Sequence, residues 1–393
     1  MTAGAARRRK PCDTMQAKLV PGVGEIPAQA WNALLADEYP FVRHEFLQLL
    51  EDTGCVGAEQ GWQPAHVVVE DERGTLVGAA PAYLKYHSFG EFVFDWAWAD
   101  AYERAGGRYY PKLLNAVPFT PAAGPRLLAR DGPAAAAVAQ AIRALTDDLG
   151  LSSAHALFLR SEEEAACYAA QGFLERRDCQ YQWFNAGYES FDGFLGALSA
   201  AKRKKIRRER RRVREAGIRL EAVPGEQIED ALWDQIYGFY ANTYHERGQD
   251  PYLTPSFFPR LARAMPGRVV VFVARDTSGP VAAALTLRDS QTLYGRHWGC
   301  LADYHSLHFE ACYYQGIEYC IRHGLRRFDA GVQGEHKLSR GFVPVATRSA
   351  HWVADERFRS AVEDFLRRER ALVDRRIEAQ QARTPYKQAL EQP

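Results

Sequence analysis

The sequence has little of what defines several large protein classes. Its cysteines, at positions 12, 55, 167, 179, 300, 312 and 320, form no CxxC pair, so neither a zinc ribbon nor a disulfide framework is expected. No apolar run approaches the roughly 20 residues that span a bilayer, and no apolar segment follows the basic start to form a secretory signal. These absences favour a globular protein of the reducing cytoplasm.

Acidic residues are almost missing from one segment. Residues 202–214 read KRKKIRRERRRVR, in which ten positions are Lys or Arg and only Glu209 is acidic. The whole chain has a formal net charge of +1, so the positive charge is concentrated here and the remainder is net negative. A run of this kind attracts phosphates, and a nucleic acid is its most direct partner.

The segment around this run has the pattern of one amphipathic helix that ends at Gly217. Its apolar stripe consists of Phe191, Phe194, Leu195, Leu198, Ile206 and Val213. Two interpretations are open for the basic faces: they bind phosphates, or they are solvated and paired within the protein. Anionic lipid headgroups are a third possible partner. The candidate nucleic-acid-binding residues are Lys202, Arg203, Lys204, Lys205, Arg207, Arg208 and Arg211.

The rest of the chain repeats one order of elements. Apolar runs at 66–70 and 76–82 predict a hairpin, followed by a helix at 134–149, a strand at 156–159, a short helix at 162–170 and a strand at 177–184. The second half repeats this order with a hairpin at 269–274 and 281–287, a helix at 307–323, a strand at 327–330, a helical turn at 335–340 and a strand at 345–353.

The repeat is also visible in the residues themselves. Gly172-Phe173 and Trp183 recur 169 positions later as Gly341-Phe342 and Trp352. A chain of 393 residues exceeds what one core needs, so we expect a duplicated α/β fold with mixed sheets. The expected parts are a disordered basic tail (1–15), two similar domains (16–190 and 191–356, the second beginning with the basic helix), and an amphipathic C-terminal helix with a disordered tail (357–393).

The repeated unit resembles the GNAT acyltransferase fold. Two such units joined by a basic helix resemble the FemABX family of peptidoglycan aminoacyltransferases, and in particular a FemAB-like branch described as peptidoglycan biosynthesis or recognition proteins. The segments that carry this resemblance are LGALSAAKRKKIRRERRRVREAGI (195–218) and LHFEACYYQGIEYCIRHGLRRFDAGVQGEHKLSRGF (307–342). The resemblance implies aminoacyl-tRNA as the polyanion that meets the basic helix.

The turn after the strand at 327–330 is the first candidate reaction centre, because α/β proteins bind ligands beyond the carboxyl ends of strands. Its two glycines, Gly331 and Gly334, allow a ligand to approach the backbone closely. Glu335, His336 and Lys337 supply an acid, a base and a cation for acyl transfer. The alternative is a capped turn with surface charges. Gln333 and Gly334 are candidate substrate-binding residues.

The start of the helix at 307–323 is the second candidate. Ser306 is expected to cap this helix, and His308 and Glu310 are expected near the reaction centre, with Asp303 and His305 contacting substrate. GNAT enzymes bind the pyrophosphate of acyl-CoA here through a glycine-rich loop, but no glycine lies between Gly299 and Gly316. Acetyl-CoA is therefore the less favoured donor, and the alternative reading is a set of locally paired first-turn residues.

Two segments of the first half complete the candidates. The aromatic run 92–98 and the proline-rich loop 117–126 are read as an acceptor groove, or alternatively as core aromatics and an ordered loop. Their candidate substrate-binding residues are Asp95, Trp96, Phe119, Thr120 and Arg126. The histidines show no metal-ligand spacing, so we expect no metal site.

The sequence thus predicts a cytoplasmic transferase that uses no bound cofactor. Its expected partners are aminoacyl-tRNA as donor and an amine acceptor, either a peptidoglycan precursor or a small molecule. Two alternatives stay open: an N-acyltransferase that uses acyl-CoA, and a non-catalytic protein that binds cell-wall precursors or RNA.

Overall fold

A computed structural model describes residues 15–332 and 334–387. The expected basic tail 1–15 lies outside this range apart from its last residue, and Gln333 and residues 388–393 also lie outside it. No helix in the described part of the chain is both long and apolar enough to cross a membrane.

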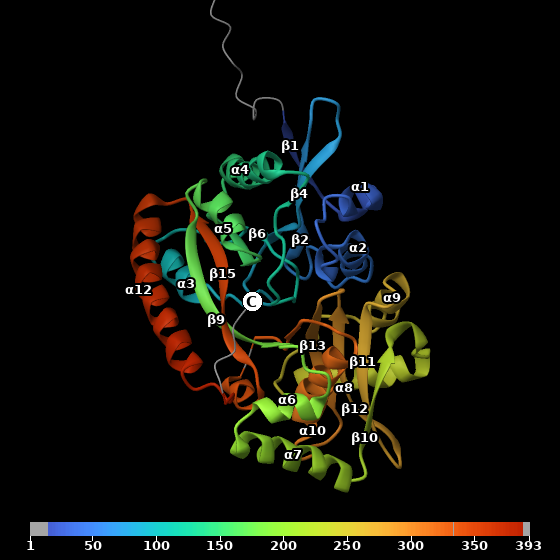
Figure 1. Ribbon diagram of the computed structural model, residues 1–393. Coiled ribbons are helices and arrows are strands. Elements are labelled where there is room, and N and C mark those ends of the chain that lie inside the picture. Colours follow the sequence, from blue (N-terminus) through green and yellow to red (C-terminus); the bar gives the residue numbers. More distant parts are fainter. Residues whose placement is uncertain (1–14, 333, 388–393) are drawn as a thin grey trace, which may run out of the picture.

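The first half of the chain is a mixture of strands and helices (Figure 1). Its elements are β1 (Gln16–Val20), α1 (Ala28–Asn32), α2 (His44–Asp52), β2 (Trp62–Pro64), β3 (His66–Glu70), β4 (Leu76–Ala80), β5 (Ala82–Lys85), α3 (Trp96–Arg104), β6 (Lys112–Asn115), β7 (Leu128–Ala129), α4 (Gly132–Asp148), β8 (Ser153–Leu159), α5 (Glu162–Ala169) and β9 (Leu174–Phe184), with 3₁₀ turns η1 (Val23–Glu25) and η2 (Pro40–Val42).

The second half repeats this order behind two helices. Its elements are α6 (Phe191–Ala197), α7 (Ala200–Glu215), β10 (Arg219–Pro224), 3₁₀ turn η3 (Gly225–Gln227), α8 (Asp230–His245), α9 (Phe257–Ala264), β11 (Val269–Asp276), β12 (Gly279–Arg288), β13 (Thr292–Cys300), α10 (Leu307–Phe309), π-helix η4 (Glu310–Tyr314), α11 (Gln315–Arg322), β14 (Arg327–Asp329), 3₁₀ helix η5 (Glu335–Arg340), β15 (Val343–Val353) and α12 (Glu356–Gln381).

One long sheet joins the two halves. Its strand order is β10-β11-β12-β13-β14-β9-β15-β8-β6-β5-β2, and a separate small sheet has the order β1-β3-β4-β7. Pro81 separates β4 from β5, so this edge of the first half is shared between both sheets. The architecture confirms the expected mixed α/β fold with a duplicated unit.

The two repeats exchange their last strands. β9 of the first repeat pairs with β14 of the second, and β15 of the second repeat pairs with β8 of the first. β9 and β15 also pair antiparallel with each other, from Val343↔Gln182 to His351↔Leu174. Neither half can therefore close its sheet without a strand from the other, and the seam between them is fixed by backbone hydrogen bonds.

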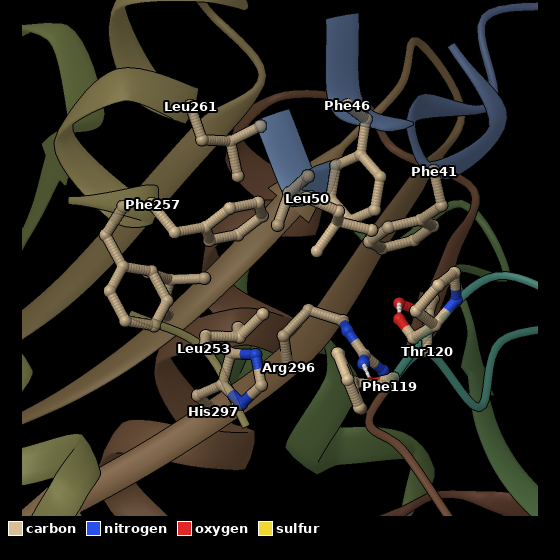
Figure 2. Close-up of a pocket in the computed structure, with 14 residues that line it drawn as sticks. Phe41, Phe46, Leu50, Phe119, Thr120, Leu253, Phe257, Leu261, Arg296 and His297 are labelled. Atoms are coloured by element: carbon tan, nitrogen blue, oxygen red, sulfur yellow. Dashed lines mark hydrogen bonds between the residues drawn. The ribbon is translucent and has the colours of Figure 1, made fainter. Parts of the chain in front are cut away.

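Aromatic packing reinforces this seam on the side away from α12. Phe41 and Tyr39 of the first half pack edge-to-face against Tyr294 of β13, and Phe46 of α2 packs against Phe257 of α9. Figure 2 shows this region, with side chains from α2 and α9 meeting above β13. α12 lies along β9 and β15 on the other side (Figure 1). There the Arg176 guanidinium of β9 donates two hydrogen bonds to the Glu369 carboxylate of α12.

Two expectations about helices and one about the C-terminal tail were wrong in detail. The predicted amphipathic helix around the basic run is two helices, α6 and α7, with a break at Leu198 and Ser199. The predicted helix 307–323 contains a π-helical turn, and Ser306 precedes it in a left-handed conformation without a side-chain cap. The first residues of the expected disordered C-terminal tail are packed, because Tyr386 donates a hydrogen bond to the Gly341 carbonyl at 2.6 Å.

Candidate active site

A cavity of about 540 Å³ lies at the seam between the halves. The first half contributes Phe89, Phe92, Phe94, Trp96, Phe119 and Pro121. The second half contributes the rest of the wall from α8 and the loop after it, β12, β13, α10, η4, the loop after β14 and η5. The volume of this cavity and its position between the two halves are typical of a site that binds a small molecule.

The cavity exists because β13 and β14 diverge. Their parallel pairing ends at Tyr294↔Asp329, although β13 continues to Cys300. The register of β12 and β13 shifts at Leu285, which leaves Arg296 as the extra residue of a bulge. Gly295, Arg296 and the segment 330–332 consequently line an open notch.

The π-helix η4 divides its side chains between this notch and α7. Cys312 and Tyr313 line the cavity, as does His308 of the preceding α10. Glu310 and Tyr314 point to α7. The wider turn of a π-helix shifts the side chains that follow it, and such turns are frequent at functional sites. Burial raises the pKa of the Cys312 thiol well above its usual value, so this thiol stays protonated and is a poor nucleophile.

Lys337 lies at the bed of the cavity and is nearly inaccessible to solvent. Its ammonium donates hydrogen bonds to the carbonyls of Ala330, at 2.9 Å, and Gly331, which leaves one of its three N–H groups for a ligand. Burial lowers the pKa of Lys337 to about 8, although the charge of Asp329 opposes this shift. The side chain is therefore mostly charged at pH 7.

Two neutral imidazoles lie beside Lys337. Burial and nearby positive charges lower the pKa of His308 to about 4, and partial burial together with Arg340 and Lys337 lowers the pKa of His336. His336 does not line the cavity but shares a hydrogen bond of 2.9 Å with the hydroxyl of Tyr313, which does. The structure thus brings together three of the five predicted catalytic residues.

The two predicted catalytic carboxylates are held elsewhere. Glu310 is buried in an ion pair with Arg210 at 3.0 Å and accepts a hydrogen bond from Gln315. Glu335 is exposed and accepts hydrogen bonds from Arg376 and Gln380 of α12. Neither carboxylate lines the cavity, so the sequence-based assignment of both to the reaction centre does not match their positions.

Asp303, His305 and Gly334 also stay outside the cavity wall. Asp303 is exposed, and His305 shares hydrogen bonds with Ser306 and with Arg212 of α7. Gly334 precedes η5 with a φ of 106°, a conformation that suits glycine, and so serves the turn that presents Lys337.

One buried carboxylate joins the basic helix to the site. Glu209 of α7 accepts hydrogen bonds from the Arg340 guanidinium, at 2.9 Å, and from the Tyr314 hydroxyl. Arg340 is itself buried and donates to the His336 carbonyl at 2.8 Å. The only acidic residue of the basic run thus fixes α7 to η5, the element that carries His336 and Lys337.

The remaining charges of α7 divide into two groups. Arg210 pairs with Glu310 and Glu318, Arg207 with Asp192, and Arg211 with Glu215. Arg203 donates to the carbonyls of Leu195 and Leu198 at the break before α7. Within the described residues no ion pair involves Lys202, Lys204, Lys205, Arg208 or Arg214. Pairing within the protein therefore accounts for part of the positive charge of α7, and these five cations have no carboxylate partner among the described residues.

Of the first-half candidates, only Trp96 and Phe119 line the cavity. Asp95 is buried and pairs with the Lys112 ammonium at 2.6 Å. Burial opposes ionisation of Asp95, but the charge of Lys112 outweighs it and lowers the pKa of this carboxyl. Thr120 donates to the Pro118 carbonyl beside the small apolar void shown in Figure 2.

Arg126 plugs the equivalent notch of the first half. The loop 117–126 runs between β6 and β8, and Gly124 bridges to Leu159 of β8. Arg126 is inaccessible to solvent and donates to the carbonyls of Leu157, Ala122 and Pro125. The loop therefore fills the place where a ligand would enter, and Arg126 stabilises this loop instead of meeting the cavity.

Sequence reasoning missed most residues of the cavity wall. Thr243, Tyr244, Arg247, Gln249 and Tyr252 come from the end of α8 and the loop behind it, where no motif marks them. Arg296 and His297 lie in β13, and no sequence pattern predicts the bulge in this strand. Within the described residues, no group of three or more His, Cys, Asp or Glu side chains is arranged to hold a metal ion.

The architecture defines the class of tandem GNAT-type folds. FemX has a similar structure, with a TM-score of 0.51 and 11% identity over 86% of this chain and 98% of that one. L-PGS from Bacillus licheniformis gives 0.50 and 12% over 82% and 94%. The C-terminal domain of a protein described as a lysylphosphatidylglycerol synthetase, from Agrobacterium fabrum, gives 0.53 and 10% over 86% and 95%. Identities this low show a shared fold.

The family model FemAB-like, described as peptidoglycan biosynthesis/recognition, matches residues 22–388. The chain therefore belongs to the FemAB-like family. No curated protein matches the chain.

The Glu209–Arg340 pair gives a direct test of how α7 is fixed. Glu209→Ala leaves the buried Arg340 guanidinium without its carboxylate, and we expect a loss of about 3–5 kcal/mol in the free energy of unfolding, measured by chemical denaturation. Glu215→Ala removes an exposed carboxylate from the same helix and should cost less than about 1 kcal/mol. Equal effects of the two substitutions would contradict the anchoring role.

Lys337 predicts a pH dependence of stability. Because its pKa falls from 10.5 in the unfolded chain to about 8 in the folded protein, the unfolded state binds more protons between these values. The free energy of unfolding of the wild type should therefore rise relative to Lys337→Met between pH 8 and 9.5, by up to roughly 1.4 kcal/mol per pH unit. Denaturation curves at pH 7.5, 8.5 and 9.5 measure the difference, and a constant difference would show that Lys337 keeps an ordinary pKa.

Proposed function

We propose that this chain transfers an aminoacyl group from aminoacyl-tRNA to an amine acceptor, which is a peptidoglycan precursor or a small molecule. The observation that carries the proposal is the connection of α7 to the cavity: Glu209 fixes the basic helix to Arg340 of η5, and Lys337 of η5 forms the cavity bed. A polyanion held on the free cations of α7 would lie next to the reaction centre.

The charges of the cavity suit an amine nucleophile. None of the described residues that line it is Asp or Glu, whereas Arg247, Arg296 and Lys337 are cationic. A low-dielectric site with only positive charges lowers the pKa of a bound ammonium group. The acceptor would enter as a neutral amine, so the reaction needs no strong base from the protein.

The transfer itself forms one bond and breaks one. The amine nitrogen attacks the carbonyl carbon of the ester, the bond from this carbon to the ribose oxygen breaks, and the amine proton ends on that oxygen. The free N–H group of Lys337 is available to stabilise the negative charge on the carbonyl oxygen. Because the ester is already activated, positioning in the cavity supplies much of the remaining rate.

The notch argues against acyl-CoA as donor. The helix that follows β13 begins with Ser306 in a left-handed conformation, runs for three residues and changes to a π-helix. It lacks the glycine-rich turn and the regular first turn that hold a pyrophosphate in the usual GNAT manner. These features support an RNA-borne donor, and a cytoplasmic activity is part of this proposal.

The free cations of α7 test the proposal. Replacing Lys204, Lys205 and Arg208 with Ala should weaken tRNA binding by at least tenfold at 50 mM salt and flatten its dependence on salt concentration, because fewer counterions are released. Filter binding with total tRNA at several salt concentrations measures both effects. A matched control replaces the exposed Arg73, Arg108 and Arg357, which lie outside α7.

If the control variant lost tRNA binding equally, the weaker binding of the α7 variant would reflect only its lower net charge and not a contact of α7 with tRNA. An unchanged salt slope in the α7 variant, or stabilisation of the wild type by micromolar acetyl-CoA in a thermal-shift series, would contradict the tRNA donor.

A further inference from the structure

We propose that the cavity binds an anionic acceptor. Arg247 and Arg296 would form a subsite for its carboxylate or phosphate group, and the aromatic walls would contact the apolar part of the ligand. The assignment of this ligand as the acceptor rests on the proposed function. The subsite itself follows from the charges, hydrogen bonds and packing of the cavity wall.

Arg247 and Arg296 line the same cavity and are joined by a short chain of contacts. The backbone N–H of Arg247 donates to the Tyr244 carbonyl at 2.9 Å, and the Arg296 guanidinium donates to the Phe119 carbonyl. Tyr244 packs edge-to-face against Tyr252, with ring centroids 5.5 Å apart. Tyr252 in turn stacks on Phe119 at 4.7 Å. This part of the cavity wall is therefore built from both halves of the chain.

Both arginines keep donors for a ligand. Arg296 donates to the Phe119 carbonyl through one terminal nitrogen, as Figure 2 shows, and has no further hydrogen bond or ion pair with the described residues. The Arg247 guanidinium is exposed and has none with them. A planar guanidinium binds carboxylate or phosphate oxygens in pairs, and no lining Asp or Glu competes for these donors.

The apolar part of the ligand would meet exposed aromatic rings. Phe89 and Trp96 are 52% and 46% exposed, and Trp96 stacks on Phe94 at 4.3 Å. Exposed rings that line a cavity usually serve a ligand.

These rings are held rigidly from below. The buried Lys112 ammonium binds Ser88, Glu91 and Asp95 at 2.6–2.9 Å, and these three residues flank the aromatic positions of the segment 88–96. A preorganised wall of this kind loses little entropy when a ligand binds.

The occupant is therefore an anion on an apolar ring or chain, and a free ammonium ligand should be rejected. Four probes share one body and differ in charge: 3-phenylpropionate, 3-phenylpropyl phosphate, 3-phenylpropan-1-ol and 3-phenylpropylamine. Ligand-observed NMR or calorimetry gives their dissociation constants with the wild type, Arg247→Gln, Arg296→Gln and the control Arg263→Gln, whose arginine lies on α9 and pairs with Asp230.

We expect the anions to bind at least tenfold more tightly than the alcohol and the amine. Each of the two glutamine variants should weaken the anions about tenfold without changing the alcohol, and Arg263→Gln should change neither. Whichever anion binds more tightly identifies the natural group as carboxylate or phosphate. Because Arg247 is exposed, its variant keeps the test valid even if Arg296→Gln disturbs folding.

Equal affinity for the amine and the carboxylate, or unchanged anion binding in Arg247→Gln, would overturn the proposal. The measurement uses no tRNA. Its failure would therefore remove the anion subsite and leave tRNA binding by α7 untouched, whereas failure of the tRNA experiment would leave the subsite standing as a ligand site of another reaction.

Discussion

The exchange of β9 and β15 between the two repeats is the constraint on which the rest of the structure depends. Because each half completes its sheet with a strand from the other, the halves form one continuous sheet and cannot shift independently. The seam is thus rigid enough to present a cavity whose walls come from both. The same exchange brings α12 against β9 and β15, and lets Tyr386 tie the C-terminal segment to Gly341 at the end of the site loop.

The two halves have separate roles within this frame. The second half keeps an open notch between β13 and β14, where the bulge at Arg296 and the π-helix η4 direct side chains into the cavity. The first half fills its equivalent notch with the loop that Arg126 secures, and contributes an aromatic rim instead. The second half of the duplicated fold thus provides the open notch, and the first half provides one wall of the cavity. The basic helix is attached to the open notch by Glu209, which explains why a single acidic residue lies within so basic a run.

The sequence predicted the duplication and most strands, because these depend on local periodicity and on the Gly-Phe and Trp repeats. The resemblance to the FemAB-like family rested on the segments 195–218 and 307–342. The sequence also predicted that Lys337 and His308 share a site. It could not predict the strand exchange, since pairing partners of β9 and β15 are set by long-range register. It misplaced Glu310 and Glu335, because each carboxylate pairs with an arginine that is distant in sequence. Glu310 pairs with Arg210 of α7, and Glu335 pairs with Arg376 of α12. Arg247 and Arg296 were missed because nothing local marks a cavity wall assembled from a loop and a bulge.

A single-turnover assay tests the central claim most directly. The protein is mixed with a radiolabelled aminoacyl-tRNA pool and candidate amine acceptors, and label is followed from the tRNA ester to an amide product. The account predicts that label moves only when both acceptor and protein are present, and that Lys337→Met slows this transfer while tRNA binding persists. Label that stays on tRNA with every acceptor, together with acyl transfer from an acyl-CoA to one of the same amines, would contradict it.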